Sequence, residues 1–403
     1  MFKKKVATVL LGVMTLSVAL TGCGGGNTQE PAKETAGNAA AKDVIKIGVF
    51  EPLTGNNAAG GQLEVEGVKL ANKLYPEVLG KKVELVINDN KSDQGEAVTA
   101  VNNLIDQEQV NAIIGSWGSS YAMAAGEIIK EAGIPTVGAS CTNPLVTAGN
   151  PYYFRATFID SFQTYVLAQY AAEKGYNKVA IIKEVSNDYA IGQAKFFEDA
   201  LKKFTKDENC IVANVDYQSG DQDFTAQLQN VAKANPDAIF APGNFNEAAL
   251  IAQQARQQGI NTPLIGGDTW EVPEFLEIGG MAVEGVVITT MFAEEAANSE
   301  KATEFLTAFR EEYKKEPSSV AVLGYDAYLL ILDAIERAGS AEPQAIRDAL
   351  EANEGFEGAS GIIKFDENGD AIKGVVIKEV VKDEAKEGMC KFKYVTTVEP
   401  QLD

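Results

Sequence analysis

Short apolar runs that alternate with amphipathic segments constrain the fold of this chain more than any other feature of its sequence. From residue 44 onward, nearly continuous apolar runs are typical of strands that are buried on both faces; they span residues 44–50, 82–88, 110–115 and 134–138. Between them lie helical patterns, one of which places Ala97, Val98, Val101, Leu104 and Ile105 on one helical face. This repetition of strand, helix and strand predicts an α/β fold with a doubly wound parallel sheet.

The same pattern restarts after residues 152–161, so we expect two similar halves in tandem. The second half has predicted strands at 178–183, 210–217, 237–243 and 263–268, with helices near 191–204, 223–234 and 246–258. Then follow a strand (284–290), helices at 300–315, 323–338 and 343–352, and strands at 374–381 and 391–398. The last two strands are interpreted as an antiparallel addition that both lobes could share. About 360 residues beyond the first 42 exceed what one core usually supports, which predicts two domains.

The N-terminus has the pattern of an export signal. Lys3, Lys4 and Lys5 precede an uncharged apolar stretch at 6–20 that is too short to span a bilayer. The sequence Leu-Thr-Gly-Cys that ends at Cys23 resembles the bacterial lipobox, and the segment after it has no apolar periodicity. We therefore expect residues 1–22 to be a lipoprotein signal peptide and residues 23–42 a flexible tether lipidated at Cys23. The alternative is an ordinary cleaved signal with an incidental cysteine. The expected location is the extracytoplasmic face of the cell membrane, in a periplasm or at the cell surface.

Charge and composition exclude several classes of function. The chain has a formal net charge of −22, and removal of residues 1–22, with three lysines and no acid, makes it −25. A chain this acidic repels phosphate backbones, so we expect no nucleic-acid partner. The absence of histidine excludes His-based triads and His metal sites. Cys141, Cys210 and Cys390 lack zinc-like spacing.

Two weaker motifs favour structural interpretations. The segment 366–370, Asp-Glu-Asn-Gly-Asp, has oxygens at alternate positions like a calcium loop, but Ala371 stands where such a loop needs glycine, which favours a tight turn. Cys141 has no obvious base to activate its thiol, so a packed thiol is favoured over a nucleophile. We therefore expect no metal and no cofactor.

The loops after the predicted strands indicate the chemistry of a ligand. Open α/β sheets bind ligands at the carboxyl ends of their strands. In the first half these loops (51–61, 116–122 and 139–144) carry hydroxyls, glycines and amides without Lys or Arg. In the second half the loops 184–192, 244–249 and 268–273 carry acids and aromatic residues. A donor-rich wall opposite an acidic wall suits a zwitterion. The candidate ligand-binding residues are Trp117, Ser119, Ser120, Ser140, Thr142, Tyr189, Asn244, Asp268 and Trp270.

Two alternatives apply to these candidates. Ser119 and Ser120 could be helix N-caps that do not touch a ligand. The aromatic side chains near the loops could pack between loops and helices rather than line a pocket; if they line it, a larger or aromatic amino acid becomes plausible. These aromatic residues are Trp117, Tyr121, Phe245 and Trp270.

The chain resembles a known family in segments spread over about 300 residues, which include "IKIGVFEPLTGNNAAGG", "IIGSWGSS", "IPTVGASCTNP" and "ARQQGINTPLIGGD". Their order and spacing resemble those of the extracytoplasmic solute-binding proteins of branched-chain amino acid ABC transporters. The resemblance implies a type I periplasmic-binding-protein fold, with two Rossmann-like lobes joined by three crossovers. It implies an N-terminal lobe of 43–157 plus 287–367 and a C-terminal lobe of 158–286 plus 368–403.

The resemblance also implies roles for particular residues. Ser119, Ser140 and Thr142 match the positions that bind the carboxylate and amine of an amino acid, Asp268 matches the acid that holds the ammonium, and Tyr189 matches a tyrosine of the second lobe. The implied function is a monomeric receptor, not an enzyme, that captures a neutral hydrophobic amino acid and delivers it to membrane permease subunits. Aromatic amino acids, amides or small organic acids remain alternative ligands, and a ligand-sensing partner of a signalling protein remains an alternative role.

The sequence departs from the family pattern in two places. Gly60 replaces a tyrosine that members can carry in the first loop, which predicts a pocket opened on that side. Ser92 and Gly118 stand where some relatives have a disulfide, so that disulfide is expected to be absent.

Overall fold

Residues 44–297 and 299–400 are described by the computed structural model of the protein. The predicted signal peptide, Cys23 and the tether lie outside the described residues. Among the described helices, none combines the length and the apolar character needed to cross a membrane.

The first sheet has six strands in the order β2-β3-β1-β4-β5-β6. All neighbouring strands are parallel except β2 and β3, which are antiparallel. The bounds are β1 Val44–Glu51, β2 Glu77–Val78, β3 Lys81–Asp89, β4 Ala112–Ile114, β5 Thr136–Gly138 and β6 Tyr153–Arg155.

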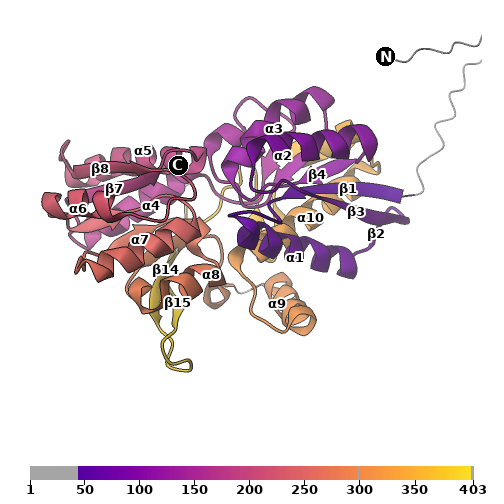
Figure 1. The fold of residues 1–403 in the computed structure, drawn as a ribbon. Helices are drawn as coiled ribbons and strands as arrows, with labels where there is room; N and C mark the ends of the chain where they lie inside the picture. Colours follow the sequence, from indigo (N-terminus) through magenta and orange to yellow (C-terminus); the bar gives the residue numbers. More distant parts are fainter. Residues whose placement is uncertain (1–43, 298, 401–403) are drawn as a thin grey trace, which may run out of the picture. The chain divides into compact units, whose positions relative to one another are not determined.

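Helices cover both faces of this sheet (Figure 1). On one face α1 (Ala58–Leu74) packs beside α10 (Ser319–Ala338), although the two helices are far apart in the sequence. On the other face lie α2 (Gln94–Asn102) and α3 (Ser119–Ala132). The central strands therefore bury both of their faces: in β4, Ala112 and Ile114 belong to one apolar cluster, and Ile113 belongs to the cluster beneath α2 and α3. This double burial explains the continuous apolar runs in the sequence.

The second sheet has seven strands in the order β15-β14-β11-β10-β9-β7-β8. Its parallel part comprises β7 Val179–Glu184, β8 Ile211–Tyr217, β9 Ala238–Phe240, β10 Leu264–Gly266 and β11 Val287–Thr290. The strands β14 Val375–Lys382 and β15 Cys390–Val398 extend it in antiparallel orientation. One face carries α4 (Asp160–Glu173) and α5 (Asp188–Thr205), and the other carries α6 (Thr225–Ala234), α7 (Phe245–Gln257) and α8 (Pro273–Gly279) (Figure 1).

The remaining elements return to the first sheet. Helices α9 (Glu300–Tyr313) and α11 (Pro343–Glu351) lie beside α1 and α10, and a hairpin of β12 (Phe356–Gly358) and β13 (Gly361–Ile363) contacts α9 and α10. The described chain thus crosses between the two sheets after β6, after β11 and after β13. Two doubly wound lobes with three crossovers confirm the predicted fold class.

The pairing of β11 corrects the predicted lobe boundary. Residues 287–367 were assigned to the first lobe, but Ile265 of β10 pairs with Val287 and β14 pairs with the other edge of β11. The strand is therefore internal to the second sheet, and the crossing follows it. The tail strands β14 and β15 belong to the second sheet alone, which agrees with the assignment of 368–403 to the C-terminal lobe and shows that the two lobes do not share them.

The predicted turn at 366–370 is confirmed, since Asp366 Oδ1 accepts hydrogen bonds from the backbone N–H groups of Asn368 and Asp370.

Cys141, Cys210 and Cys390 are buried free thiols.

The close packing of α1 on α10 depends on Gly67. A Cβ atom there would lie 1.8 Å from the backbone oxygen of Ala321, so Gly67→Ala must push the helices apart. Overpacking of this kind costs about 1–3 kcal/mol, and we expect a loss of that size in the free energy of unfolding measured with urea. Gly126→Ala in α3 is the matched control: its nearest neighbour would be 3.8 Å away, and it should gain about 0.5–1 kcal/mol as a better helix former. Equal effects of the two changes would contradict this account.

Candidate ligand-binding site

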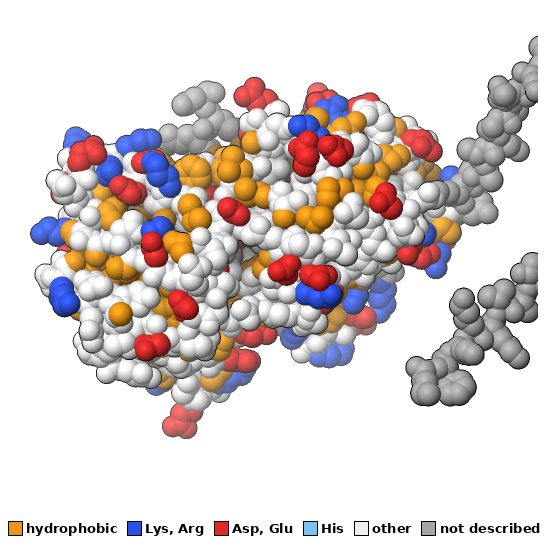
Figure 2. All heavy atoms as spheres, turned by 45° about the horizontal axis from the view of Figure 1, so that its top comes forward, with side chains coloured by type: hydrophobic (Ala, Val, Ile, Leu, Met, Phe, Trp, Pro, Cys, Tyr) orange, Lys and Arg blue, Asp and Glu red, His pale blue; other side chains and the backbone are white. Residues whose placement is uncertain are grey.

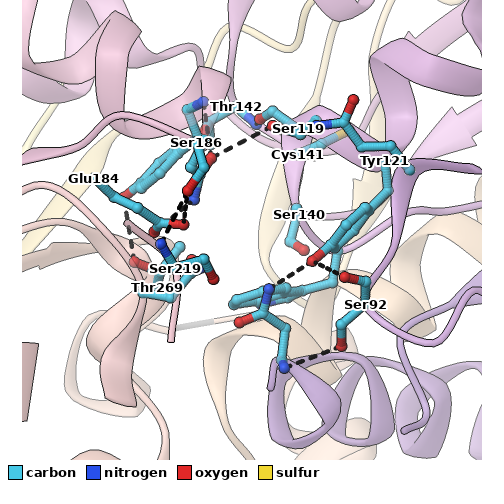
Figure 3. A pocket seen from close by; sticks show the side chains of 18 of the residues that line it. Ser92, Ser119, Tyr121, Ser140, Cys141, Thr142, Glu184, Ser186, Ser219 and Thr269 are labelled. Carbon is cyan, nitrogen blue, oxygen red and sulfur yellow. Dashed lines mark hydrogen bonds between the residues drawn. The ribbon is translucent and has the colours of Figure 1, made fainter. Parts of the chain in front are cut away.

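A cavity of about 230 Å³ lies where the carboxyl ends of the parallel strands in the two sheets meet (Figure 3). Its first-lobe wall consists of residues from the loops after β1, β3, β4 and β5, and its second-lobe wall of residues that follow β7, β8, β9 and β10. The lining residues are Asn57, Ser92, Asp93, Gln94, Trp117, Gly118, Ser119, Ser120, Tyr121, Ser140, Cys141, Thr142, Glu184, Ser186, Asn187, Tyr189, Ser219, Asn244, Asp268 and Thr269. The location follows the rule for open α/β sheets.

Ser119 is the best-placed donor of the first-lobe wall. Its Oγ accepts hydrogen bonds from the backbone N–H groups of Thr142 and Asn143, at 3.2 and 3.1 Å. With its lone pairs engaged, the hydroxyl has its proton to donate. Ser119 is also the first residue of α3, whose N-cap is Gly118 and has no side-chain capping bond, so the alternative of a capping serine is wrong. The positive end of the helix dipole and a hydroxyl donor thus face the cavity together.

Asp268 dominates the second-lobe wall. It follows β10 at the start of a 3₁₀ turn (Asp268–Trp270) and is only 5% exposed. Its Oδ1 accepts hydrogen bonds from Gln163 Nε2 at 2.6 Å and from the Tyr189 hydroxyl at 2.9 Å. Burial raises the pKa of Asp268 to about 6, and the hydrogen bonds oppose this rise. The carboxylate is held in place by neutral donors rather than by a cation.

Further buried acids surround this wall. Asp160 at the start of α4 accepts a hydrogen bond from Gln193 at 3.1 Å, and burial, with the charge of Asp268, raises its pKa to about 7. Glu184, at the end of β7, has a pKa raised to about 7 by burial and then by Glu247, and it contacts Ser186 and Asn187. None of the described salt bridges includes these acids. A cationic group that enters the cavity would therefore meet carboxyl groups that form no described ion pair.

The outer surface is different. On the face shown in Figure 2, Lys and Arg side chains are interspersed with Asp and Glu side chains, and neither sign gathers in one patch. Typical exposed pairs join Arg310 to Glu316 and Arg347 to Glu351.

Most of the predicted site residues come together. Trp117, Ser119, Ser120, Ser140, Thr142, Tyr189, Asn244 and Asp268 all line the cavity. Trp270 does not: its indole is fully buried, stacks on Phe275, and donates a hydrogen bond from Nε1 to the backbone oxygen of Gly243 at 3.1 Å. The Trp270 indole thus packs in the core beneath the loop that carries Asp268. Glu247 also lies outside the lining and binds the backbone N–H of Gly220.

The space near Gly60 was predicted to be open, and that prediction is wrong. A Cβ atom at Gly60 would lie 2.3 Å from the indole of Trp117, so the indole occupies the space that a side chain at position 60 would need. Trp117 is 2% exposed and forms part of the cavity wall. Tyr121 also lines the cavity, where its hydroxyl accepts a hydrogen bond from Asn57 and donates one to the backbone of Ser92.

Sequence reasoning missed several lining residues. Glu184, Ser186 and Asn187 stand in the same loop as Tyr189, but that loop was represented by the tyrosine alone. Ser92 and Ser219 follow β3 and β8, and the rule that strand ends carry the site could have found them.

Direct hydrogen bonds join the two lobes at both sides of the cavity. On one side the Ser120 Oγ accepts from the backbone N–H of Asp188 at 2.9 Å, and Asn143 Nδ2 donates to the backbone oxygen of Asp188 at 3.0 Å. On the other side Asn246 Nδ2 donates to the backbone oxygen of Asn56 at 2.6 Å. Ser120, predicted to touch a ligand, thus also bridges the lobes. The structure represents a closed arrangement of the cavity.

Two doubly wound lobes closed around a polar cavity define a solute-binding protein that holds its ligand between lobes. A family model described as periplasmic binding protein matches residues 44–385. The chain belongs to this family, whose members are solute-binding receptors.

Comparison with individual proteins agrees. The chain is 31% identical over 336 residues to the leucine-, isoleucine-, valine-, threonine- and alanine-binding protein of Pseudomonas aeruginosa, covering 82% of this chain and 88% of the relative. It is 41% identical to the crystal structure of a leucine-binding protein, LivK, from Thermotoga maritima, with a TM-score of 0.83 and coverage of 88% and 99%. It is 33% identical to the LivJ substrate-binding protein of Streptococcus pneumoniae in complex with isoleucine, with a TM-score of 0.78 and coverage of 87% and 100%.

The bond from Asn246 to Asn56 should contribute to ligand affinity although neither side chain needs to touch the ligand. A hydrogen bond contributes about 0.5–1.5 kcal/mol net, so Asn246→Ala should weaken ligand binding about two- to tenfold by making closure less favourable. Calorimetry would measure the change, with Asn209→Ala, at an exposed asparagine before β8, as the control. An affinity equal to that of the wild type would show that this contact does not stabilise the closed state.

Proposed function

We propose that the protein is the extracytoplasmic receptor of an ABC importer, which captures an α-amino acid between its two lobes and delivers it to membrane permease subunits. The single observation that carries the proposal is Asp268: a buried carboxylate, held by neutral donors, that faces Ser119 across a closed cavity. A ligand ammonium at Asp268 would compensate the buried charge.

The opposite end of the cavity suits a carboxylate. The Ser119 hydroxyl has a proton to donate, and the N-terminal N–H groups of α3 lie beside it. We infer that the ligand carboxylate binds Ser119 and this helix end, with Thr142 in the same wall and Asn244 in the second-lobe wall. The two ends together select the zwitterion.

The relatives favour a neutral hydrophobic side chain, since their names and ligands include leucine, isoleucine and valine. Within the cavity, Trp117 and Tyr121 offer aromatic surface to such a side chain. We infer a branched-chain amino acid as the ligand.

A second candidate ligand has an amide side chain. Glu184, Ser186, Asn187 and Ser219 make part of the cavity wall polar, and Glu184 is only 2% exposed. The strands that carry Glu184 and Asp268 are separated by β9, so one extended ligand could reach both. Calorimetry with leucine and glutamine decides between the candidates: tighter binding of glutamine would favour the amide.

The proposal also covers the anchor, the location, the monomeric state, the absence of a reaction and the closing motion. The predicted sequence elements favour a lipid anchor at Cys23, which would hold the receptor at the extracytoplasmic membrane face as a monomer. We also infer that the ligand is bound without being transformed, because burial raises the pKa of the cavity thiol, Cys141, to about 12 and keeps it unreactive. We further propose that the two lobes, with the boundary placed after β11, close around the ligand as rigid bodies.

Asp268 should make ligand affinity depend on pH. Only the ionised carboxylate pairs with an ammonium, so a proton competes with the ligand below its pKa of about 6. The contribution of Asp268 to the wild-type affinity should be constant above pH 7 and should fall by up to about tenfold per pH unit below pH 6. Asp268→Asn should bind the ligand about two to three and a half decades more weakly at pH 7, because breaking a buried pair costs about 3–5 kcal/mol. The affinity of this variant should also decrease less than that of the wild type as the pH falls below 6.

The matched control is Asp199→Asn, which removes an exposed acid of the same lobe that pairs with Lys195. It should bind like the wild type. The 2-oxo acid of the preferred ligand, which lacks the ammonium, should bind poorly. Wild-type affinity in Asp268→Asn, or equal binding of the 2-oxo acid, would refute the assignment of an amino acid.

The anchor is tested separately. Cys23→Ala should move the protein from the membrane fraction to the soluble fraction, or leave an unprocessed precursor, because the thiol that carries the lipid is missing. Mass spectrometry of the N-terminus and fractionation of cells would measure this. Cys210→Ala, which removes a buried thiol, should leave the protein membrane-bound. A soluble wild type without lipid would contradict the proposed anchor.

A further inference from the structure

Two buried carboxyl groups lie directly behind the first-lobe wall of the cavity. Glu51 is the last residue of β1, and Glu64 lies in α1; both are 0% exposed. Neither lines the cavity, but each contacts a residue that does. Their role is not explained by ligand contact.

Each carboxyl group holds one part of the wall. Glu51 Oε2 accepts a hydrogen bond from the backbone N–H of Trp117 at 2.6 Å, and Ser116 Oγ lies 3.4 Å from the same oxygen. Glu64 Oε2 accepts the hydroxyl proton of Ser140. The two glutamates therefore fix the loops after β4 and β5, which carry Trp117 and Ser140 to the cavity.

The second oxygen of each carboxyl group has no hydrogen-bond donor in the described part of the chain. Glu51 Oε1 and Glu64 Oε1 are buried and have no donor among the described residues. The two carboxyl groups are nevertheless within hydrogen-bonding reach of one another. A single proton shared by the two carboxyl groups would let one donate to the other, whereas two carboxylates would repel each other.

Among the described residues, no Lys or Arg forms an ion pair with either glutamate. Cys141 and Tyr153 are the other titratable groups that act on it, and burial raises the pKa of both, so both are neutral near pH 7. Arg155, which also faces these groups, is engaged by Asp370, with 2.5 Å between Nε and Oδ1. Burial raises the pKa of Glu64 to about 7, and burial together with the charge of Glu64 raises that of Glu51 well above its usual value.

The backbone is adapted to the pair. A Cβ atom at Gly115 would lie 3.0 Å from Glu51 Oε1, and one at Gly324 in α10 would lie 2.3 Å from the backbone oxygen of Glu64 and 3.2 Å from its Cγ. Side chains at these two positions would crowd the parts of β1 and α1 that carry the two glutamates.

We propose that Glu51 and Glu64 share one proton and act as a positioning pair, which keeps Trp117 and Ser140 in the arrangement that binds ligand and weakens binding when that proton is lost. The pair also decides what Ser140 can do. Because the Ser140 hydroxyl donates its proton to Glu64, it can only accept from a group in the cavity. Under the proposed function, on which this last step rests, Ser140 meets the ligand ammonium rather than the carboxylate.

Glu64→Gln tests the shared proton. The amide oxygen can accept from Ser140 while the amide N–H₂ donates to Glu51, so this variant permanently reproduces the protonated pair. Calorimetry with leucine, or with glutamine if that binds more tightly, should be run from pH 6.5 to 9.0. We expect the affinity of the wild type to fall, by up to about tenfold per pH unit, once the proton is released. Glu64→Gln should match the wild type at pH 6.5 and stay nearly flat.

Glu66→Gln is the matched control, because it removes a carboxylate from the same helix that pairs with Lys315 instead. It should follow the wild-type profile. Glu64→Met, which takes the acceptor from Ser140, should bind at least tenfold more weakly at every pH. Parallel profiles for the wild type and Glu64→Gln would overturn the proposal.

Thermal unfolding without ligand keeps this test separate from the proposed function. The folded pair retains a proton at a pH where the unfolded glutamates, with an ordinary pKa near 4.3, have released it. The raised folded pKa therefore means that stability falls as the pH rises from about 5 through neutral. Glu64→Gln should show a smaller loss of melting temperature than the wild type or Glu66→Gln. If no amino acid binds but this difference is seen, the proposed ligand fails and the pair stands; equal melting profiles would overturn the pair whatever the ligand.

Discussion

Parallel strands bring all of their carboxyl ends to one edge of a sheet, and the cavity of this protein depends on two such edges facing each other. The loops after β4 and β5 meet the loops after β7 and β10 across about 230 Å³ of space. Three crossings of the chain hold the two sheets together in this way. Antiparallel β14 and β15 add width to the second sheet at an edge away from the parallel strands that end at the cavity.

Burial of acids near this cavity has a physical cost that the fold resolves in two different ways. On the second-lobe wall, Asp268 accepts hydrogen bonds from Gln163 and Tyr189, and the positive charge of a ligand would compensate its carboxylate. On the first-lobe side, Glu51 and Glu64 have no access to the cavity, so a shared proton is the available compensation. The same desolvation thus supports recognition on one wall and rigidity on the other.

Closure links these two walls. The hydrogen bonds that cross between the lobes at Asp188 and Asn56 are individually weak, because each replaces bonds to water. A ligand that contacts both Asp268 and Ser119 adds an interaction that exists only when the lobes are together. Differential contact of this kind is what shifts a two-state equilibrium, and it makes the closed state depend on the correct zwitterion.

Local patterns in the sequence were enough to predict the succession of strands and helices in the two halves, the strand ends as the site, and the positions of Ser119, Tyr189 and Asp268 in it. These features follow from hydrophobic period and from the rule for parallel sheets, which need only neighbouring residues. The place of β11 could not be predicted, because its pairing with β10 and β14 depends on how the crossovers return.

Tertiary structure alone decided the contacts between distant segments. The indole of Trp117 fills the space beside Gly60, Trp270 turns into the core against Phe275, and Ser120 reaches Asp188 of the other lobe. Glu51 and Glu64 are unremarkable acids in the sequence, one at the end of a strand and one in an amphipathic helix. They became a buried pair only because β1, α1 and the loop with Ser140 pack together and exclude water, which no local pattern encodes.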